Sequence, residues 1–280
     1  MRPFSKVCVI LIGLCLLGAF STLPVHAQSD PGPLKRLMTS DDSRGWTAVG
    51  RLNIGTTGFC TGALIDERTV LTAAHCLFEK SSGLLVPAAE IEFLVGWRNG
   101  RAEAYRGITH AVIHPRFDFK GRDTRARVSH DIALLRLDRP VKLPSVRPFA
   151  TATDLRTGDR VAIVSYAKSR SEAPSLQDAC TVLQRAKGVV MLSCSVDFGA
   201  SGAPVFVQGE AGPQIVAVLS AKGTVQGTAV ALAAELDTKI TTLEKLLDAP
   251  RLDNTRRRPQ IGTSSPARTQ SGFTAKFIRP

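Results

Sequence analysis

The sequence lacks a hydrophobic run long enough to span a membrane as a helix. Its longest uncharged apolar stretch, residues 7–20, has 14 residues, whereas a transmembrane helix needs roughly 20. Arg2 and Lys6 precede this stretch, and Val25-His26-Ala27 follows it as an A-x-A-like cleavage site. We therefore expect residues 1–27 to be a signal peptide removed on export, rather than a retained N-terminal anchor.

Acidic residues are also in short supply, with 24 Asp and Glu against 36 Lys and Arg and a formal net charge of +12. A hydrophobic content of 44% excludes an intrinsically disordered chain, and 23 glycines in 280 residues exclude a collagen-like repeat. Six cysteines in 280 residues also exclude a small, disulfide-rich mini-protein. A chain of this size buries a core without needing a metal or a partner, so one or two ordinary domains are expected.

No two cysteines have the two- to four-residue spacing typical of zinc ligands, so no metal site is expected. Loss of the signal peptide leaves Cys60, Cys76, Cys180 and Cys194. Four cysteines in an exported chain indicate two disulfides, for which three pairings exist. The neighbour pairing, Cys60 with Cys76 and Cys180 with Cys194, closes two short loops, each worth about 3 kcal/mol.

From Trp46 onward the chain consists of short apolar or alternating runs broken by Gly, Pro, Asn and Asp, which is typical of an all-β protein. Residues 139–148 separate two groups of such runs, and their three prolines are incompatible with a central strand or a regular helix. We interpret that segment as an interdomain linker. The expected strands are 47–52, 69–72, 91–95, 111–113, 132–137, 161–166, 181–183, 189–194, 205–207, 215–220 and 228–231.

The end of the chain predicts one helix and a basic tail. Leu236, Ile240, Leu243 and Leu247 repeat at helical spacing, and Pro250 ends the pattern. Residues 251–280 carry seven basic residues against one acidic residue and few large apolar groups, so they are expected to be disordered. This tail could attract an anionic cell-surface polymer. A second basic cluster, in residues 116–127, is expected to be an exposed loop rather than a nucleic-acid site, because stacking aromatics are scarce there.

Three motifs follow one another in the order His, Asp, Ser. Their sequences are Leu71-Thr-Ala-Ala-His75-Cys76, His130-Asp131-Ile-Ala-Leu-Leu135 and Gly199-Ala-Ser201-Gly-Ala-Pro-Val205. Each motif alone would be an ordinary structural segment, but together they resemble the trypsin-like (chymotrypsin-fold) serine peptidases. The order excludes the subtilisin and α/β-hydrolase arrangements, and the α/β-hydrolase G-x-S-x-G elbow is also incomplete because Ala203 replaces its last glycine.

The resemblance implies an all-β fold of two antiparallel six-stranded β-barrels with a C-terminal helix. On this basis residues 28–45 form an N-terminal extension, 46–140 the first barrel, and 141–250 the linker, second barrel and helix. Ser201 would be the nucleophile, His75 the general base and Asp131 the residue that orients the histidine, while the Gly199 and Ser201 amides would form the oxyanion hole. The family also pairs the cysteine beside the histidine with one about sixteen residues earlier, here Cys60, and needs no cofactor.

Two positions depart from the animal digestive enzymes. Ala200 replaces the aspartate that pairs with the new N-terminus after zymogen cleavage, and no I-V-G-G-like sequence precedes Trp46. The nucleophile loop is therefore expected to be held by other contacts, as in bacterial relatives of the glutamyl-endopeptidase kind. Ala203 replaces a glycine beside the loop and adds one methyl group, which the loop is expected to tolerate.

The substrate side chain that this chain prefers can be predicted by eliminating the preferences whose marker residues the sequence lacks. Trypsin-like enzymes that prefer Arg or Lys have an aspartate six residues before the nucleophile, and the corresponding residue here is Ser195. Glutamyl-type members have a histidine before the serine of the edge strand, whereas Leu219 precedes Ser220 here. These positions favour small or apolar substrate side chains. Residues 215–220 would pair with the substrate backbone, with Ser220 as the positioning serine.

These patterns predict a monomeric bacterial-type serine endopeptidase, secreted or periplasmic, that acts on proteins or peptides. It should have no specific nucleic-acid partner and, once the signal is removed, no membrane span. The alternative is a catalytically inactive protein of the same fold that binds polyanions through its basic surface; the replacement at Ala200 keeps this alternative open.

Overall fold

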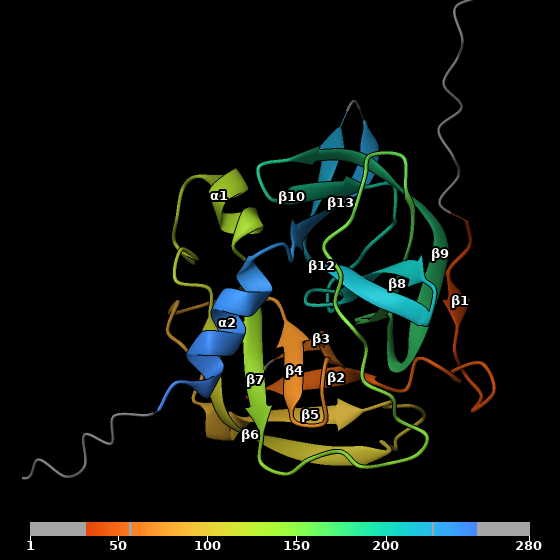
Figure 1. The fold of residues 1–280 in the computed structure, drawn as a ribbon, viewed down its shortest axis with the longest axis vertical. Helices are drawn as coiled ribbons and strands as arrows, with labels where there is room; N and C mark the ends of the chain where they lie inside the picture. Colours follow the sequence, from red (N-terminus) through yellow and green to blue (C-terminus); the bar gives the residue numbers. More distant parts are fainter. Residues whose placement is uncertain (1–31, 56–57, 226, 251–280) are drawn as a thin grey trace, which may run out of the picture. The chain divides into compact units, whose positions relative to one another are not determined.

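Most of the regular secondary structure in the computed structural model, which describes residues 32–55, 58–225 and 227–250, is β-strand (Figure 1). The strands form two sheets, and a helix follows them at the C-terminal end, which confirms the predicted fold class. Within the described ranges, no helix combines the length and apolar character that crossing a membrane requires. The predicted signal peptide and basic tail lie outside the described residues.

The first sheet is a closed six-stranded barrel in the order β2-β3-β4-β7-β6-β5, and all its pairings are antiparallel. Two short 3₁₀ helices, η1 (Ala74–Leu77) and η2 (Ala88–Glu90), connect its strands. Its strands are β2 (Val49–Ile54), β3 (Gly58–Leu64), β4 (Thr69–Thr72), β5 (Ile91–Val95), β6 (Ala104–Ile113) and β7 (Ala133–Leu137).

Strand β3 was not predicted from the sequence. Its segment contains Gly58 and Gly62, and glycine inside a run argues against a strand on propensity alone. The barrel explains why Gly62 is there: a Cβ at this position would lie 2.8 Å from Cγ1 of Val70 on the neighbouring strand. Pairing with β2 and β4 holds the strand, and the close approach of Val70 leaves room only for a hydrogen atom at residue 62, a requirement that the linear sequence does not reveal.

The second sheet has seven strands in the order β1-β9-β10-β13-β12-β11-β8. Strand β8 also pairs with β9, so that six of the strands form a closed circuit of pairings. Strand β1 comes from the N-terminal extension and adds to β9, and Leu37 just after it is fully buried. The strands are β1 (Lys35–Arg36), β8 (Arg160–Ala167), β9 (Arg170–Ala186), β10 (Val189–Leu192), β11 (Pro204–Gly209), β12 (Gly212–Val225) and β13 (Thr228–Glu235).

The segment predicted to be a linker, residues 139–148, contains no helix or strand, but it is packed against the core. Val141 and Val146 in this segment are buried. Phe149, just after it, lies with its ring centroid 6.1 Å from that of Trp46 and 4.7 Å from that of Phe206. The connection thus contributes apolar side chains to the core rather than running free over the surface.

Two helices flank the strands. Helix α2 (Lys239–Asp248) agrees with the predicted apolar stripe, because Ile240, Leu243 and Leu247 are buried. Residues 116–127 are mostly exposed, as predicted, but helix α1 (Thr124–Ser129) replaces the end of the predicted loop. The Asp123 carboxylate accepts hydrogen bonds from the backbone N–H groups of Arg125 and Ala126, and this N-cap initiates the helix.

Candidate active site

The pairing of two strands brings His75 and Asp131 together. Strand β4 pairs with β7 at Thr72 and Ala133, and His75 in η1 follows the first strand while Asp131 precedes the second. Nδ1 of His75 lies 2.6 Å from Oδ2 of Asp131, and the backbone N–H of His75 donates to Oδ1 at 2.7 Å. The Asp131 side chain is 3% exposed, whereas that of His75 is 26% exposed. This aspartate is thus a buried acceptor that fixes the tautomer and the orientation of a partly accessible imidazole.

Ser220 also contacts the aspartate, a role the sequence did not suggest. Its hydroxyl donates to Oδ2 of Asp131 at 2.5 Å. In β12 the register with β13 shifts between Leu219 and Ala221, so Ser220 is the extra residue of a bulge. Bulges redirect side chains away from the regular alternation of a strand. Sequence reasoning placed Ser220 on this edge strand, but it could not foresee the bulge or the contact with the carboxylate.

Ser201 lies in the loop before β11 and lines a cleft of about 290 Å³ that His75 also lines. The flanking residues Gly199 and Gly202 have φ angles of +94° and +80°, a region that favours glycine. Among the described residues, the Ser201 hydroxyl forms no hydrogen bond with His75. Nε2 of His75 instead lies 3.9 Å from Sγ of Cys76.

The loop that contains Ser201 is held mainly by Thr61 of the first barrel. The backbone N–H of Thr61 donates to the carbonyl oxygen of Ser201 at 2.9 Å, and the Thr61 hydroxyl donates to the carbonyl oxygen of Gly199 at 3.0 Å. The Gly202 N–H donates to the Leu219 carbonyl at 2.8 Å. In the described part of the chain, the N–H groups of Gly199 and Ser201 donate no hydrogen bond. Two amides of this loop are therefore available to an added acceptor.

The two replacements in the loop are accommodated by burial. Ala200 and Ala203 are fully buried and belong to the apolar core of the second sheet. The Ala203 N–H donates to the Ala200 carbonyl at 3.0 Å, which closes a tight turn around Ser201. An apolar side chain at residue 200 needs no charged partner, so the loop geometry does not depend on a new N-terminus.

Comparison with known proteins decides the family. Residues 38–243 match the family model described as Trypsin. The chain belongs to the trypsin family. A solved structure of a Glu endopeptidase in complex with MPD shares its fold, with a TM-score of 0.62, 18% identity, and coverage of 78% of this chain and 99% of that one. The resemblance to chymotrypsin-fold peptidases is thereby confirmed.

Curated relatives of this trypsin-family chain include proteins named as serine proteases and one named as an inactive serine protease. Coagulation factor IX of Cavia porcellus is 34% identical over 106 residues, which cover 36% of this chain and 33% of that protein. Serine protease SP24D of Anopheles gambiae is 32% identical over 120 residues, covering 41% and 40% respectively. Inactive serine protease PAMR1 of Bos taurus is 26% identical over 161 residues, covering 53% and 22%. The alignments span two fifths or less of these relatives.

The cleft is lined by several side chains that the sequence did not single out. Ser195, predicted from the sequence to be a substrate-binding residue six positions before Ser201, is exposed and is not among the lining residues; its N–H donates to Oε1 of Gln177 at 3.1 Å. Phe198 is 62% exposed, and Nζ of Lys222 lies 4.3 Å from its ring centroid. The cleft is lined by His75, Lys80, Val196, Asp197, Phe198, Ser201, Leu219, Ser220, Ala221 and Lys222.

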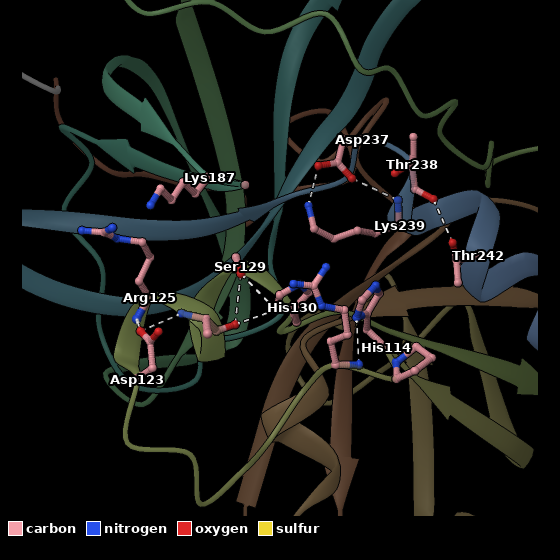
Figure 2. A pocket seen from close by; sticks show the side chains of 14 residues that line it. His114, Asp123, Arg125, Ser129, His130, Lys187, Asp237, Thr238, Lys239 and Thr242 are labelled. Atoms are coloured by element: carbon pink, nitrogen blue, oxygen red, sulfur yellow. Dashed lines mark hydrogen bonds and ion pairs between the residues drawn. The ribbon is translucent and has the colours of Figure 1, made fainter.

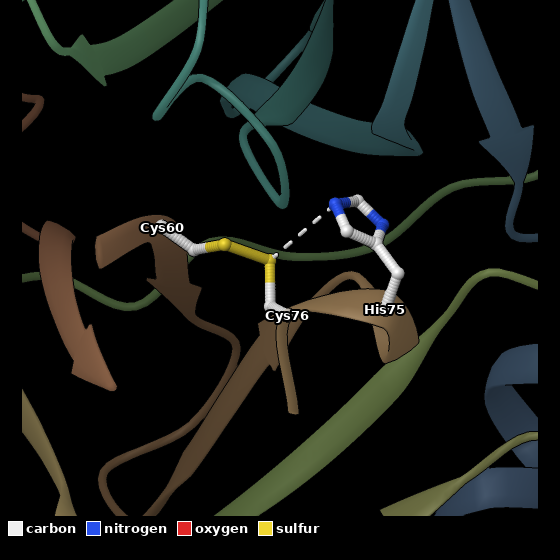
Figure 3. A group of neighbouring side chains, drawn as sticks. All are labelled: Cys60, His75 and Cys76. Atoms are coloured by element: carbon white, nitrogen blue, oxygen red, sulfur yellow. Dashed lines mark hydrogen bonds between the residues drawn. A yellow bond between two sulfur atoms is a disulfide. The ribbon is translucent and has the colours of Figure 1, made fainter. Parts of the chain in front are cut away.

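The structure contains two disulfides, Cys60–Cys76 and Cys180–Cys194. The first lies beside His75 (Figure 3), so its sulfurs and the imidazole nitrogens form a compact group. Such a group resembles a metal site by composition. However, thiolates are the ligands that metals need, and these two sulfurs are bonded to each other. The group is therefore structural: the disulfide links η1, which carries the histidine, to β3.

Proposed function

We propose that this chain is an exported serine endopeptidase that hydrolyses peptide bonds through Ser201, His75 and Asp131. The observation that carries the proposal is the doubly hydrogen-bonded His75–Asp131 pair, at 2.6 and 2.7 Å, on the same cleft as Ser201. A carboxylate in this position stabilises the imidazolium formed when the histidine takes a proton. The hydroxyl of Ser220 is a third donor to the same carboxylate and would keep it aligned.

In this mechanism Ser201 Oγ attacks the substrate carbonyl while Nε2 of His75 takes its proton. The tetrahedral oxyanion would accept hydrogen bonds from the N–H groups of Gly199 and Ser201, which donate to no described residue. His75 then gives its proton to the leaving amine, and water hydrolyses the acyl-enzyme by the same steps. The Ser201–His75 hydrogen bond has to form when substrate fills the cleft, and such bonds are often looser without substrate.

Small or apolar side chains are the proposed preference at the residue before the scissile bond. Val196, Leu219 and Ala221 supply an apolar part of the cleft lining. Lys80 and Lys222 line it as well, against one acid, Asp197, so a basic substrate side chain would meet net repulsion. A peptide library tests this preference: cleavage after Arg or Lys at rates equal to those after Ala or Leu would contradict it.

The substrate peptide is proposed to pair with β12, and the enzyme is proposed to act as a secreted or periplasmic monomer. The two disulfides agree with an oxidising compartment. The proposed attraction of the basic tail to anionic surface polymers concerns residues outside the described ranges.

A fluorophosphonate probe, which reacts covalently with an activated serine, tests the catalytic proposal. The full chain is expressed with its export signal, purified and labelled beside a Ser201→Ala control. We expect labelling of the first protein and none of the control. Peptide mapping of the labelled protein should place the adduct on Ser201.

A catalytically inactive, polyanion-binding protein is the second candidate. Two observations favour it: Ser201 and His75 share no hydrogen bond among the described residues, and one relative is an inactive serine protease. Absence of labelling both before and after limited proteolysis would overturn the catalytic proposal. Salt-dependent binding to a heparin column by the same unlabelled protein would then support the binder.

A further inference from the structure

A second cavity, of about 630 Å³, is larger than the catalytic cleft and shares no lining residue with it. It lies where the segment after β6, helix α1, the turn between β9 and β10, and the start of α2 meet (Figure 2). We call it the basic pocket. Its lining residues are His114, Pro115, Arg116, Asp123, Arg125, Ala126, Ser129, His130, Lys187, Gly188, Asp237, Thr238, Lys239 and Thr242.

Both acids of the basic pocket already have partners. The Asp123 carboxylate caps α1 by accepting from the N–H groups of Arg125 and Ala126 at 3.0 and 3.1 Å. The Asp237 carboxylate accepts from Nζ of Lys239 at 2.6 Å, and this lysine is only 8% exposed. These two carboxylates are therefore occupied by capping and by an ion pair.

Three cations of the basic pocket have no such partner. Within the described residues, the side chains of Arg116, Arg125 and Lys187 form no hydrogen bond or ion pair. They come from three different segments of the chain, of which Figure 2 labels Arg125 on α1 and Lys187 in the β9–β10 turn. Figure 2 shows the side chains of Arg125 and Lys187 extending on the same side of the pocket, where two like charges repel each other and raise the local concentration of anions. An added anion would relieve this repulsion.

A neutral histidine, His114, also lines the basic pocket. Nδ1 of His114 accepts from the Arg116 N–H at 3.2 Å, so the ring proton of the neutral form lies on Nε2. The ring stacks on His130 at 4.8 Å between centroids. Burial, and secondarily the neighbouring His130, lowers the pKa of His114 to about 4, so this ring is uncharged at neutral pH. In Figure 2 this ring lies on the other side of the pocket from Arg125 and Lys187, and in its neutral form it adds no charge to the lining.

We propose that the basic pocket is a binding site for a multiply charged oxyanion, a phosphate or sulfate group held by Arg125 and Lys187. Guanidinium groups bind such oxyanions with paired N–H donors, and a lysine adds a point charge. The group could arrive as a free small anion or as part of a sulfated polysaccharide. The proposal does not depend on catalysis, because no proposed catalytic residue lines this cavity.

Titration calorimetry with pyrophosphate measures binding to this pocket. The full chain carries Ser201→Ala in every titration, so that the result does not depend on the proposed catalytic function. Arg125→Ala and Lys187→Ala should each weaken binding about tenfold, since each removes a charge-assisted contact. Arg127→Ala is the matched control: it removes the same charge from another exposed arginine of α1, but Arg127 does not line the pocket. The control should bind within about twofold of the parent.

A saturable one-to-one isotherm that weakens only in the two pocket variants would support the proposal. Equal weakening by Arg127→Ala would show that pyrophosphate responds to net charge alone and would overturn it. So would the absence of saturable binding at low salt. A sulfated oligosaccharide that competes with pyrophosphate identifies a polysaccharide sulfate as the source of the group, whereas pyrophosphate binding without competition identifies a free oxyanion.

Discussion

Gly202, next to the proposed nucleophile, lies where the two sheets meet. Its φ is +80°, and a Cβ added there would lie 2.2 Å from Oγ1 of Thr72 and 2.3 Å from the carbonyl oxygen of Thr61. Those two atoms are already hydrogen-bonded to each other at 2.8 Å. A Gly202→Ala substitution must therefore strain the backbone, push the first barrel away and disturb this hydrogen bond.

The cost has three parts. An L-residue with positive φ costs about 1–2 kcal/mol, overpacking a well-packed site costs about 1–3 kcal/mol, and a disturbed hydrogen bond costs about 1 kcal/mol. The sum, about 3–6 kcal/mol, is a large part of the roughly 5–15 kcal/mol that stabilises a typical domain. Gly100 provides the control, because its φ is +82° and nothing lies within 4 Å of an added Cβ. Gly100→Ala should cost only the backbone part, about 1–2 kcal/mol.

Urea unfolding of both variants, followed by tryptophan fluorescence, measures the difference. We expect Gly202→Ala to lower the free energy of unfolding by about 2–4 kcal/mol more than Gly100→Ala. If the free energies of unfolding of the two variants differ by less than about 1 kcal/mol, the loop does not approach the first barrel as closely as the structure shows. Fluorophosphonate labelling should be slowed in the first variant and unchanged in the second.

Three further predictions concern the proposed triad, a disulfide and a buried histidine. Ser220→Ala removes one donor to the charged Asp131 and should lower kcat about tenfold with little change in KM, measured on a cleaved peptide; an unchanged kcat would show that the contact does not matter. Replacing Cys60 and Cys76 together by alanine should lower the free energy of unfolding by about 3 kcal/mol, as measured in urea; a loss under 1 kcal/mol would contradict this. Burial lowers the pKa of His114 from its ordinary 6.5 to about 4 in the folded chain, so the unfolded chain binds the proton more tightly and the free energy of unfolding falls as the pH is lowered from 6.5 towards 4. At most about 3 kcal/mol is involved, and His114→Leu should flatten the pH dependence of urea unfolding over that interval.

Local patterns in the sequence determined much of this protein. Alternation of apolar and polar residues located most strands, and the stripe ending at Leu247 located α2. The motifs around His75, Asp131 and Ser201 predicted the family that residues 38–243 match. Such patterns are readable because strands, helices and loop motifs impose their spacing on residues that are close together in the chain.

Only the tertiary structure decided how the parts are held. Thr61 anchors the nucleophile loop although it lies 138 residues before Gly199, and no local pattern marks it. A bulge turns Ser220 toward Asp131, and the close approach of Val70 from the neighbouring strand requires a glycine at residue 62 despite its low strand propensity. The basic pocket likewise collects Arg116, Arg125 and Lys187 from separate segments. Contacts of this kind depend on which distant segments pack together, and packing is a property of the whole folded chain.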